Sequence, residues 1–297
     1  MPSKEERPNW TIWIRAARPK TLWAAVAPVL LGTAFAFGDD AFHALSACCA
    51  FLVAVFIQVG TNYANDYQDF AQGADTADRK GPLRITQAGL ASPRAVRTAA
   101  AIAFLIAFLA GLYLVVRGGW FLLFVGLVSI LCGAIYSAGR YSLAYLGVAD
   151  LFVLVFFGPV AVAGTHYVQA LAFSWPVVLA GLGPGFLATA ILLVNNTRDI
   201  EEDRAAGKKT LVVRWGRSAG VALYGVCMAG AVVVVAASAM LAGNGWMLIA
   251  LLATPWGLAN LRTLGATSDP AVLNPLLGST SRFLLAYCLL FGLGRIM

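Results

Sequence analysis

The amino-acid sequence predicts an all-α integral membrane protein, with nine transmembrane helices around a central cavity. Hydrophobic residues make up 60% of the 297 positions and charged residues only 12%, which is too few charges to cover a soluble domain of this size. Apolar runs of roughly 17–25 residues recur along the chain, each long enough to cross a hydrocarbon core. These runs do not alternate as barrel strands would, and open sheet edges cannot be hydrogen-bonded in lipid, so we expect helices.

The apolar runs follow one another along the whole chain. In order, the predicted spans are residues 21–38, 42–66, 95–116, 118–137, 146–164, 175–197, 219–241, 245–261 and 279–297. The first follows a basic segment and stops before Asp39-Asp40, and the second stops at Asp66. The third stops before Arg117, and the sixth stops before Arg198. Charged residues therefore mark the ends of these four runs.

Residues 1–20 form a polar and basic segment ahead of the first span. Trp10 and Trp13 are interleaved there with Arg15 and Arg18, a mixture typical of a short helix at the membrane interface. No low-complexity linker interrupts the rest of the chain. We therefore expect residues 21–297 to form one membrane domain.

The basic residues are distributed unevenly between the two sides of the predicted membrane. All of the 21 Lys and Arg residues except Arg117 and Arg295 fall in the N-terminal tail, or in loops and the span ends next to them, that alternate spans place on one side. This asymmetry predicts a cytoplasmic N-terminus and, with an odd number of spans, an external C-terminus. The net charge of +7 thus reflects membrane topology and gives no reason to expect a nucleic acid partner.

Two charged loops, residues 66–94 and 198–217, each follow an apolar span that ends in Asn and Asp. They begin with oxygen-bearing side chains at helical spacing: Asn62, Asp66 and Asp69 before and in the first loop, and Asn195, Asp199 and Asp203 before and in the second. Residues at these spacings share one helix face, so each set predicts a stripe of oxygen ligands. Both stripes lie at the predicted cytoplasmic ends of their spans, where they can face one another across a cavity.

Acidic stripes at the C-terminal ends of helices run against the helix dipole and need a compensating cation. Carboxylates near lipid are also costly, and capping a helix requires only one of them, so solvated loop charges are the weaker explanation. A hard divalent ion such as Mg²⁺ fits, because it prefers oxygen ligands and is usually held by one or two carboxylates together with substrate phosphates.

Basic residues follow both stripes. Arg79, Lys80 and Arg84 come after the first, and Lys208 and Lys209 come after the second. Cations beside metal-binding carboxylates favour a polyphosphate ligand. The sequence has no GxxxxGK[ST] loop, which argues against a nucleotide bound in the P-loop manner. A diphosphate carried on a lipid is the natural ligand for such a site in a membrane protein.

The two motifs resemble those of the UbiA-type intramembrane prenyltransferases. Asn65-Asp66-Tyr67-Gln68-Asp69 is similar to their NDxxD motif, and Asp199-Ile200-Glu201-Glu202-Asp203 is similar to their DxxxD motif. The resemblance extends over most of the chain and is strongest to the branch that acts on 1,4-dihydroxy-2-naphthoate. The further stretches that carry it are Arg18-Pro19-Lys20-Thr21-Leu22, Phe156-Phe157-Gly158-Pro159-Val160-Ala161, Asn195-Asn196, Ala206-Gly207-Lys208-Lys209-Thr210 and Asn274-Pro275-Leu276-Leu277.

One position departs from the wider family pattern. The general first motif continues as NDxxDxxxD, and here Gly73 occupies its last position, with Asp75 two residues later. The pattern therefore leaves open whether Asp69 or Asp75 contacts metal directly.

The resemblance implies a nine-helix fold with both motifs on the cytoplasmic side of the cell (inner) membrane. It also implies that a polyprenyl group passes from an all-trans polyprenyl diphosphate to 1,4-dihydroxy-2-naphthoate, with loss of CO₂ and diphosphate, in menaquinone biosynthesis. We expect two Mg²⁺ ions, with Mn²⁺ able to substitute: one held by Asp66 and Asp69, the other by Asp199 and Asp203.

The remaining assignments concern the substrates. We expect Lys208 and Lys209 to act on the leaving diphosphate together with the four metal-binding aspartates. The expected substrate-binding residues are Lys20, Asn62, Asn65, Asp75, Arg79, Lys80, Arg84, Arg140 and Asn195. Among these, Lys20 and Arg140 lie at predicted cytoplasmic helix ends, where they could bind an acceptor carboxylate or equally a lipid headgroup.

Two alternatives remain at this stage. The enzyme could use another aromatic acceptor, such as 4-hydroxybenzoate or homogentisate, or a phytyl donor. A secondary transporter could also place Asp and Asn within the membrane, but such sites usually lie near mid-membrane in broken helices. The acidic residues here lie instead at helix ends that continue into basic loops.

Overall fold

The computed structural model describes residues 10–73, 81, 84–139 and 142–297, and these contain helices and turns but no strand. The helices are α1 (Trp10–Ala16), η1 (Pro19–Thr21), α2 (Trp23–Gly38), α3 (Ala44–Ala71), α4 (Pro93–Gly118), α5 (Phe121–Ala134), α6 (Leu143–Leu146), α7 (Ala149–Val155), η2 (Phe156–Val160), α8 (Ala161–Ala170), α9 (Trp175–Arg198), α10 (Ile200–Ala205), α11 (Leu211–Trp215), α12 (Arg217–Ala242), η3 (Gly245–Ala253), α13 (Thr254–Ala266) and α14 (Pro270–Ile296). The predicted all-α membrane class is confirmed.

The number of full-length spans differs from the predicted nine. Among the described residues, seven helices are long and apolar enough to cross a membrane, or eight if Trp10–Thr21 and Trp23–Gly38, bent by 56°, count as one span. The predicted span 118–137 corresponds to α5, which has 14 residues. At 1.5 Å per residue it is only about 21 Å long, shorter than a hydrocarbon core of about 30 Å.

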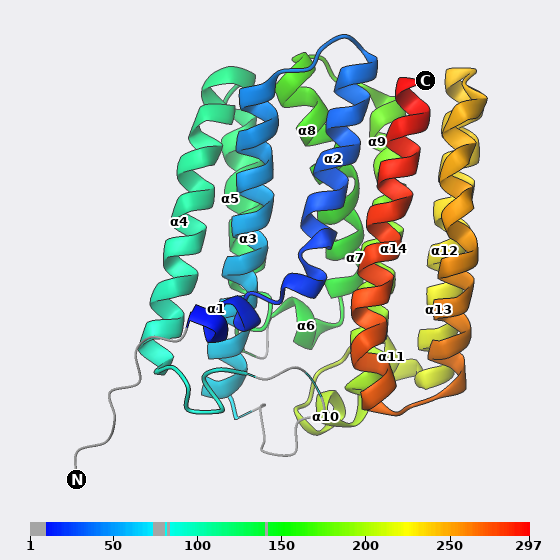
Figure 1. Cartoon of the computed structure of the whole chain (residues 1–297). Coiled ribbons are helices and arrows are strands. Elements are labelled where there is room, and N and C mark those ends of the chain that lie inside the picture. The colour runs from blue at the N-terminus through cyan, green and yellow to red at the C-terminus, as the bar shows by residue number, and fades with distance from the viewer. Residues whose placement is uncertain (1–9, 74–80, 82–83, 140–141) are drawn as a thin grey trace.

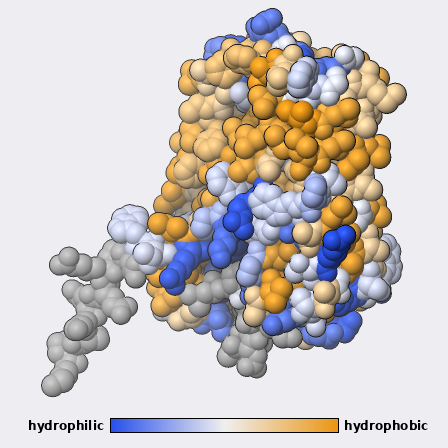
Figure 2. All heavy atoms as spheres, turned by 45° about the vertical axis from the view of Figure 1, so that its right-hand side comes forward, coloured by the Kyte–Doolittle hydropathy of each residue, from blue (hydrophilic) through white to orange (hydrophobic). Residues whose placement is uncertain are grey.

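The long helices stand side by side, and the short ones lie near one end of the bundle (Figure 1). Helices α1, α10 and α11 lie at the lower end in this view, where α3 and α9 also finish, whereas the C-terminus and the α2–α3 connection lie at the upper end. Apolar side chains dominate the upper part of the surface in Figure 2, and polar ones gather in the lower part. Both acidic stretches therefore lie at the same end of the molecule.

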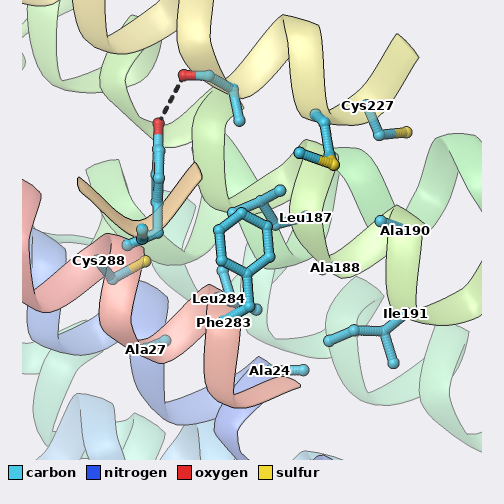
Figure 3. Close-up of a cluster of buried hydrophobic side chains, with 14 of the residues drawn as sticks. Ala24, Ala27, Leu187, Ala188, Ala190, Ile191, Cys227, Phe283, Leu284 and Cys288 are labelled. Atoms are coloured by element: carbon cyan, nitrogen blue, oxygen red, sulfur yellow. Dashed lines mark hydrogen bonds between the residues drawn. The ribbon is translucent and has the colours of Figure 1, made fainter. Parts of the chain in front are cut away.

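The main hydrophobic core surrounds α9, which packs against α2, α12 and α14. Figure 3 shows Leu187 and Ile191 of α9 near Phe283 and Leu284 of α14, with Ala27 of α2 beside them. Helix α9 is the most buried of the membrane-spanning helices, whereas far fewer residues of α3 and α4 are buried. One side of the bundle is therefore densely packed, and α3, at the end of which the first acidic motif lies, belongs to the looser side.

The segment α7–η2–α8 forms one broken span against α9. Gly158 has a non-helical backbone conformation (φ −107°, ψ −109°) and is followed by Pro159, which cannot donate a helical hydrogen bond. A Cβ on Gly158 would lie 2.7 Å from the carbonyl oxygen of Gly181, so only glycine allows this approach of the two backbones. The close contact holds one wall of the cavity described below against α9.

The helix ends that carry the acidic motifs differ from the predicted boundaries. Helix α3 continues to Ala71, five residues past the predicted end at residue 66, so both Asp66 and Asp69 are helical. Helix α9 ends at Arg198, and after Asp199 the chain turns into the short helix α10. The amide of Asp203 donates to the carbonyl of Asp199 at 2.8 Å, so the second motif also keeps helical spacing.

Candidate active site

A cavity of about 730 Å³ lies between α2, α3, α5, α7 and α9. It follows α3 from Ala50 to Asp69, which is about 28 Å at 1.5 Å per residue. Its upper part is lined by apolar side chains, among them Val29, Val53, Leu122, Val125, Phe156 and Val168. Its lower end is polar and carries most of the ionisable groups. The cavity therefore suits a ligand with a long apolar tail and a charged head.

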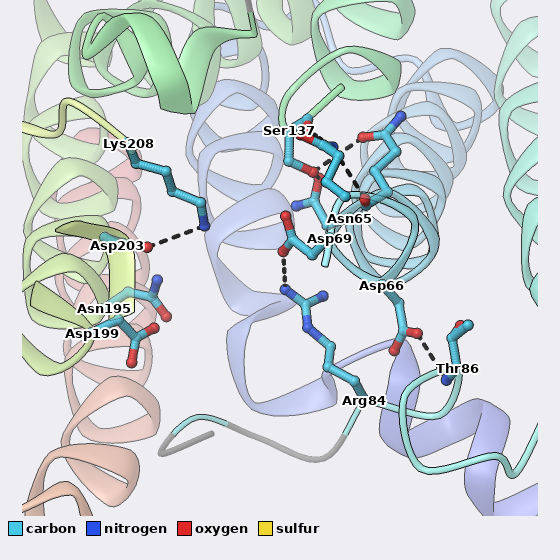
Figure 4. A network of polar contacts seen from close by, with 12 residues as sticks. Asn65, Asp66, Asp69, Arg84, Thr86, Ser137, Asn195, Asp199, Asp203 and Lys208 are labelled. Atoms are coloured by element: carbon cyan, nitrogen blue, oxygen red, sulfur yellow. Dashed lines mark hydrogen bonds and ion pairs between the residues drawn. The ribbon is translucent and has the colours of Figure 1, made fainter. Parts of the chain in front are cut away.

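The first acidic cluster lies near the end of α3. Asp69 lines the cavity and is buried, and its Oδ2 lies 2.6 Å from Nη2 of Arg84, which is also buried (Figure 4). Oδ1 of Asp69 has no hydrogen-bond partner among the described residues. One turn earlier, Asn65 also lines the cavity, and its Oδ1 accepts a hydrogen bond from Ser137 at 3.0 Å. Asp69 is thus a carboxylate with one oxygen paired and one available.

Asp66 does not line the cavity, although it stands in the same motif. Its two carboxylate oxygens accept hydrogen bonds from the backbone amides of Ile85 and Thr86, each at 3.0 Å. In Figure 4 it points toward Thr86, away from Asp199 and Asp203. The residues of α3 that line the cavity at this end are Asn62, Asn65 and Asp69. The predicted stripe of Asn62, Asp66 and Asp69 is corrected accordingly, because Asp66 turns to the far side of the helix.

The second cluster lies where α9 meets α10. Asp199 is buried and lines the cavity, and its Oδ1 accepts a hydrogen bond from Nε of Arg198 at 2.6 Å. The same guanidinium donates to the side-chain oxygens of Asn195 and Asn274, both at 2.9 Å. Arg198 is itself almost fully buried, so this charge-assisted network fixes Asp199 and Asn195 at the cavity wall.

Asp203 lies one turn further on and pairs with Lys208, whose Nζ is 3.1 Å from its Oδ1. Burial raises the pKa of the Asp203 carboxyl to about 6, although the Lys208 ammonium opposes the shift. Both side chains line the cavity. Lys209, by contrast, is exposed and does not line it. Of the two lysines, only Lys208 can therefore meet a ligand held at Asp203.

The N-terminal segment adds a basic rim to the cavity, formed by Arg15, Arg18 and Lys20. The side-chain amide of Asn62 donates to the carbonyl of Ala17 at 2.9 Å, and this bond ties the segment to α3. Asn62 therefore positions the basic rim, in addition to lining the cavity itself.

The predicted site residues fall into three groups. Those that the structure brings to the cavity are Lys20, Asn62, Asn65, Asp69, Arg84, Asn195, Asp199, Asp203 and Lys208. Those that it places elsewhere are Asp66 and Lys209. Those that lie outside the described residues are Asp75, Arg79, Lys80 and Arg140.

Sequence reasoning missed several residues that the structure brings to the site. These are Arg15, Arg18, Glu202 and Asn274, which line the cavity, and Arg198, which supports Asp199. Arg198 had a visible signal, since it stands between Asn195 and Asp199 at a spacing that lets it bond both. Arg18 stands in a stretch that carries the family resemblance, but its place at the cavity depends on how the N-terminal segment folds over α3.

The carboxylates suit a magnesium ion that is shared with a phosphate ligand. Over the described residues, no three His, Cys, Asp or Glu side chains come together as a ready-made metal site. Asp69, Asp199 and Asp203 instead lie around the cavity, each paired with a cation. Mg²⁺ in phosphate-transfer sites takes one or two carboxylates and completes its shell with phosphate and water. The unpaired Oδ1 of Asp69 supplies the kind of oxygen such an ion needs.

Residues 25–286 match the UbiA prenyltransferase family. The chain belongs to this family. It is 38% identical to the 1,4-dihydroxy-2-naphthoate octaprenyltransferase of Mycobacterium tuberculosis, over 93% of this chain and 94% of that one. It is 36% identical to the enzyme of the same name from Escherichia coli, over 95% and 94% of the two chains. The resemblance inferred from the two motifs is confirmed.

Solved structures of UbiA proteins share the fold. A UbiA homologue from Archaeoglobus fulgidus bound to DMAPP and Mg²⁺ aligns with a TM-score of 0.63 at 20% identity, over 96% of this chain and 98% of that one. A digeranylgeranylglyceryl phosphate synthase aligns with a TM-score of 0.65 at 16% identity, over 97% and 98% of the two chains. The chain is thus a multi-pass membrane protein with the UbiA fold.

Proposed function

We propose that this protein transfers a polyprenyl group from an all-trans polyprenyl diphosphate to 1,4-dihydroxy-2-naphthoate, with release of diphosphate and CO₂. The observation that carries the proposal is a long apolar cavity whose charged end holds carboxylates from α3 and from α9–α10, each beside a cation. The choice of acceptor is supported by relatives at 36–38% identity that are named for this reaction.

In this proposal the donor diphosphate lies at the polar end and its prenyl tail runs along α3. Asp69, Asp199 and Asp203 would hold two Mg²⁺ ions, which neutralise charge on the diphosphate when bound. Arg84 and Lys208 would donate hydrogen bonds to its oxygens. Arg79 and Lys80, from outside the described residues, remain proposed as further contacts to the diphosphate, and Asp75 as a further metal ligand.

The reaction joins the two substrates by one carbon–carbon bond and breaks one bond in each of them, the allylic carbon–oxygen bond of the donor and the bond from the ring to the carboxylate of the acceptor. The allylic carbon–oxygen bond breaks and its electrons leave with the diphosphate, where the cationic side chains stabilise the growing negative charge. The electron-rich naphthoate ring attacks the allylic carbon, and the carboxylate is lost as CO₂. Apolar side chains along the cavity keep water from capturing the allylic carbon.

The acceptor also needs a site for its own negative charge. The rim formed by Arg15, Arg18 and Lys20 lines the same cavity and carries three positive charges. We assign the carboxylate of the naphthoate to this rim, with Arg140 as a further candidate from outside the described residues. Asn62 ties the rim to α3, and Asn65 and Asn195 support the carboxylates beside them.

We further propose that the protein lies in the cell (inner) membrane with the active site facing the cytoplasm. The strong bias of Lys and Arg toward one side supports this orientation. A reporter fused after Gly73 or Lys209 should then read cytoplasmic, and one fused after Asp40 should read external. Reporters on the two acidic loops that read on opposite sides would contradict the proposal.

The activity can be tested directly with purified protein in lipid nanodiscs. Geranylgeranyl diphosphate, 1,4-dihydroxy-2-naphthoate and Mg²⁺ should give a prenylated product, with CO₂ and diphosphate released in equal amounts. A chelator should stop the reaction, Mg²⁺ or Mn²⁺ should restore it, and the larger ion Ca²⁺ should restore less. Product with 4-hydroxybenzoate or homogentisate but none with the naphthoate would assign a different acceptor, and no product with any acceptor would leave a transporter as the better explanation.

A further inference from the structure

The first acidic motif contains two aspartates, and only Asp69 lines the cavity. Asp66 is 2% exposed and has both carboxylate oxygens bound to backbone amides of a distant loop, Ile85 through Oδ2 and Thr86 through Oδ1. To reach a metal ion in the cavity, it would have to break both bonds. Two buried amides would then lack partners, at about 1–3 kcal/mol each.

The loop that Asp66 holds is compact and well anchored. The carbonyl of Ile85 accepts hydrogen bonds from the amides of Leu90 at 2.9 Å and Ala91 at 3.2 Å. The side chain of Ile85 is fully buried in a small cluster with Ala16 of the N-terminal helix and Val96 of α4. Asp66 thus joins α3 to a turn that also contacts both neighbouring elements.

Arg84 immediately precedes this turn. The nitrogen of Ile85 belongs to the peptide bond that follows Arg84, so fixing this amide also fixes where the Cα of Arg84 lies. The guanidinium is directed into the cavity, where it pairs with Asp69. One aspartate of the motif therefore faces the site, and the other holds the backbone that supplies its cation.

We propose that Asp66 is not a metal ligand but a positioning residue, which fixes the loop that carries Arg84 into the active site. The role of Arg84 as a holder of diphosphate rests on the proposed function, whereas the contacts of Asp66 do not. This assignment separates two aspartates that the NDxxD pattern treats alike.

The first test compares Asp66→Asn with a matched control on the same helix, Asp69→Asn. An Asn at position 66 can accept one amide through its oxygen, but its NH₂ group would face the other amide. We would measure Mn²⁺ binding from the EPR signal of free Mn²⁺, with a non-reacting prenyl thiodiphosphate present at saturation. Asp69→Asn should weaken Mn²⁺ binding by roughly tenfold or more, since it removes a charged ligand, and Asp66→Asn should leave it nearly unchanged.

Hydrogen–deuterium exchange of the peptide that contains Ile85 and Thr86 supplies a readout independent of metal and activity. These amides should exchange faster in Asp66→Asn and remain protected in Asp69→Asn. In the unmodified protein they should stay protected when Mn²⁺ and the thiodiphosphate bind. Loss of protection on binding would show that Asp66 leaves the loop for the metal and would overturn the proposal, even if the variant itself failed to fold.

A double-mutant cycle with Arg84→Gln tests whether Asp66 acts through Arg84. If it does, Asp66→Asn should weaken donor binding in the unmodified protein and add little in the Arg84→Gln background, because coupled residues are not additive. Fully additive losses, or a loss of Mn²⁺ binding as large as that of Asp69→Asn, would overturn the proposal. If the unmodified protein failed to prenylate the naphthoate, the proposed function would fail, but the exchange and Mn²⁺ measurements would still decide the role of Asp66.

Discussion

The two acidic clusters look alike in sequence but are built differently. In the second, Asp199 and Asp203 both line the cavity, and their cations are near in the chain: Arg198 is the preceding residue and Lys208 follows five residues after Asp203. In the first, the cation is Arg84, which lies fifteen residues after Asp69 and beyond the end of α3. Both clusters therefore hold a buried carboxylate beside a cation, but the cation is close in sequence in the second cluster and distant in the first.

This difference explains why the first cluster uses one of its aspartates for support. A cation that comes from a distant loop needs a fixed backbone. Otherwise the entropy cost of ordering the loop would oppose its ion pair with Asp69. Asp66 supplies that support through Ile85 and Thr86. Arg198 needs no such loop, since α9 itself carries it next to Asp199. A pair of aspartates about one helical turn apart can thus place both carboxylates at the cavity, or one at the cavity and one against a neighbouring loop.

The largest effects should come from the carboxylates that face the cavity in each cluster. Asp69→Asn and Asp199→Asn should each lower kcat by roughly 10³-fold, because the charge on the leaving diphosphate would lose a bound cation. Steady-state kinetics in nanodiscs at saturating Mg²⁺ would measure this. Near-normal turnover in either variant would show that its cluster does not take part in the reaction.

The lysines of the second cluster provide a sharper contrast between adjacent residues. Lys208→Ala should lower kcat by roughly 10²–10³-fold and affect the KM for donor less, since its charge matters most as the diphosphate leaves. Lys209→Ala should change little, because Lys209 is exposed and outside the cavity. An equal loss of kcat in both variants would mean that the lysines act through the loop as a whole, and not through the position of Lys208 at the cavity.

Arg198 should matter more for the folded structure than for the leaving group. Arg198→Met leaves Asp199 as a buried carboxylate without its partner, which costs about 3–5 kcal/mol in comparable pairs. Thermal unfolding in detergent should show a lower Tm, and Mg²⁺ with a prenyl thiodiphosphate should recover part of it, because the ion would neutralise Asp199. A Tm equal to that of the unmodified protein would contradict the support that we assign to Arg198.

A smaller effect should appear in the pH dependence of metal binding. Burial raises the pKa of Asp203 to about 6, and Lys208 opposes this shift, so the carboxyl gains a proton and binds metal less well as the pH falls through that value. Lys208→Gln removes the opposing charge and should move the acidic limb of Mn²⁺ binding to higher pH. Because both proteins are measured with the same thiodiphosphate, the ionisation of this ligand affects both binding curves equally. If the acidic limb of Mn²⁺ binding stayed in place or moved to lower pH in Lys208→Gln, the pairing of Lys208 with Asp203 would be contradicted.

Much of this structure could be predicted from the sequence. The all-α membrane class followed from the length and composition of the apolar runs, and the meeting of the two acidic stretches followed from counting alternate spans. The length of α5 could not be predicted, because its apolar run continues into turns that hydropathy does not distinguish. The described residues therefore contain seven or eight helices of full spanning length, and α5 is a shorter apolar helix at the place of the remaining predicted span.

The direction of individual side chains was harder to predict. Helical spacing places Asp66 about as close to Asp69 as Asn65 is, so spacing alone cannot say which of them faces the cavity. The outcome depends on the loop around Ile85, which packs against α3 from a different part of the chain. The distinction between Lys208 and Lys209 likewise depends on how the chain turns after α10, where the amide of Lys208 bonds the carbonyl of Asp203.

The central claim is that the two clusters together hold one donor diphosphate through metal ions. It is tested most directly by counting Mn²⁺ ions bound per chain in the presence of a prenyl thiodiphosphate, from the EPR signal that free Mn²⁺ loses on binding. We predict two ions in the unmodified protein, about one in Asp69→Asn and about one in Asp199→Asn, as expected if each cluster would hold one ion of a two-metal site. Two ions retained in both variants would contradict the claim.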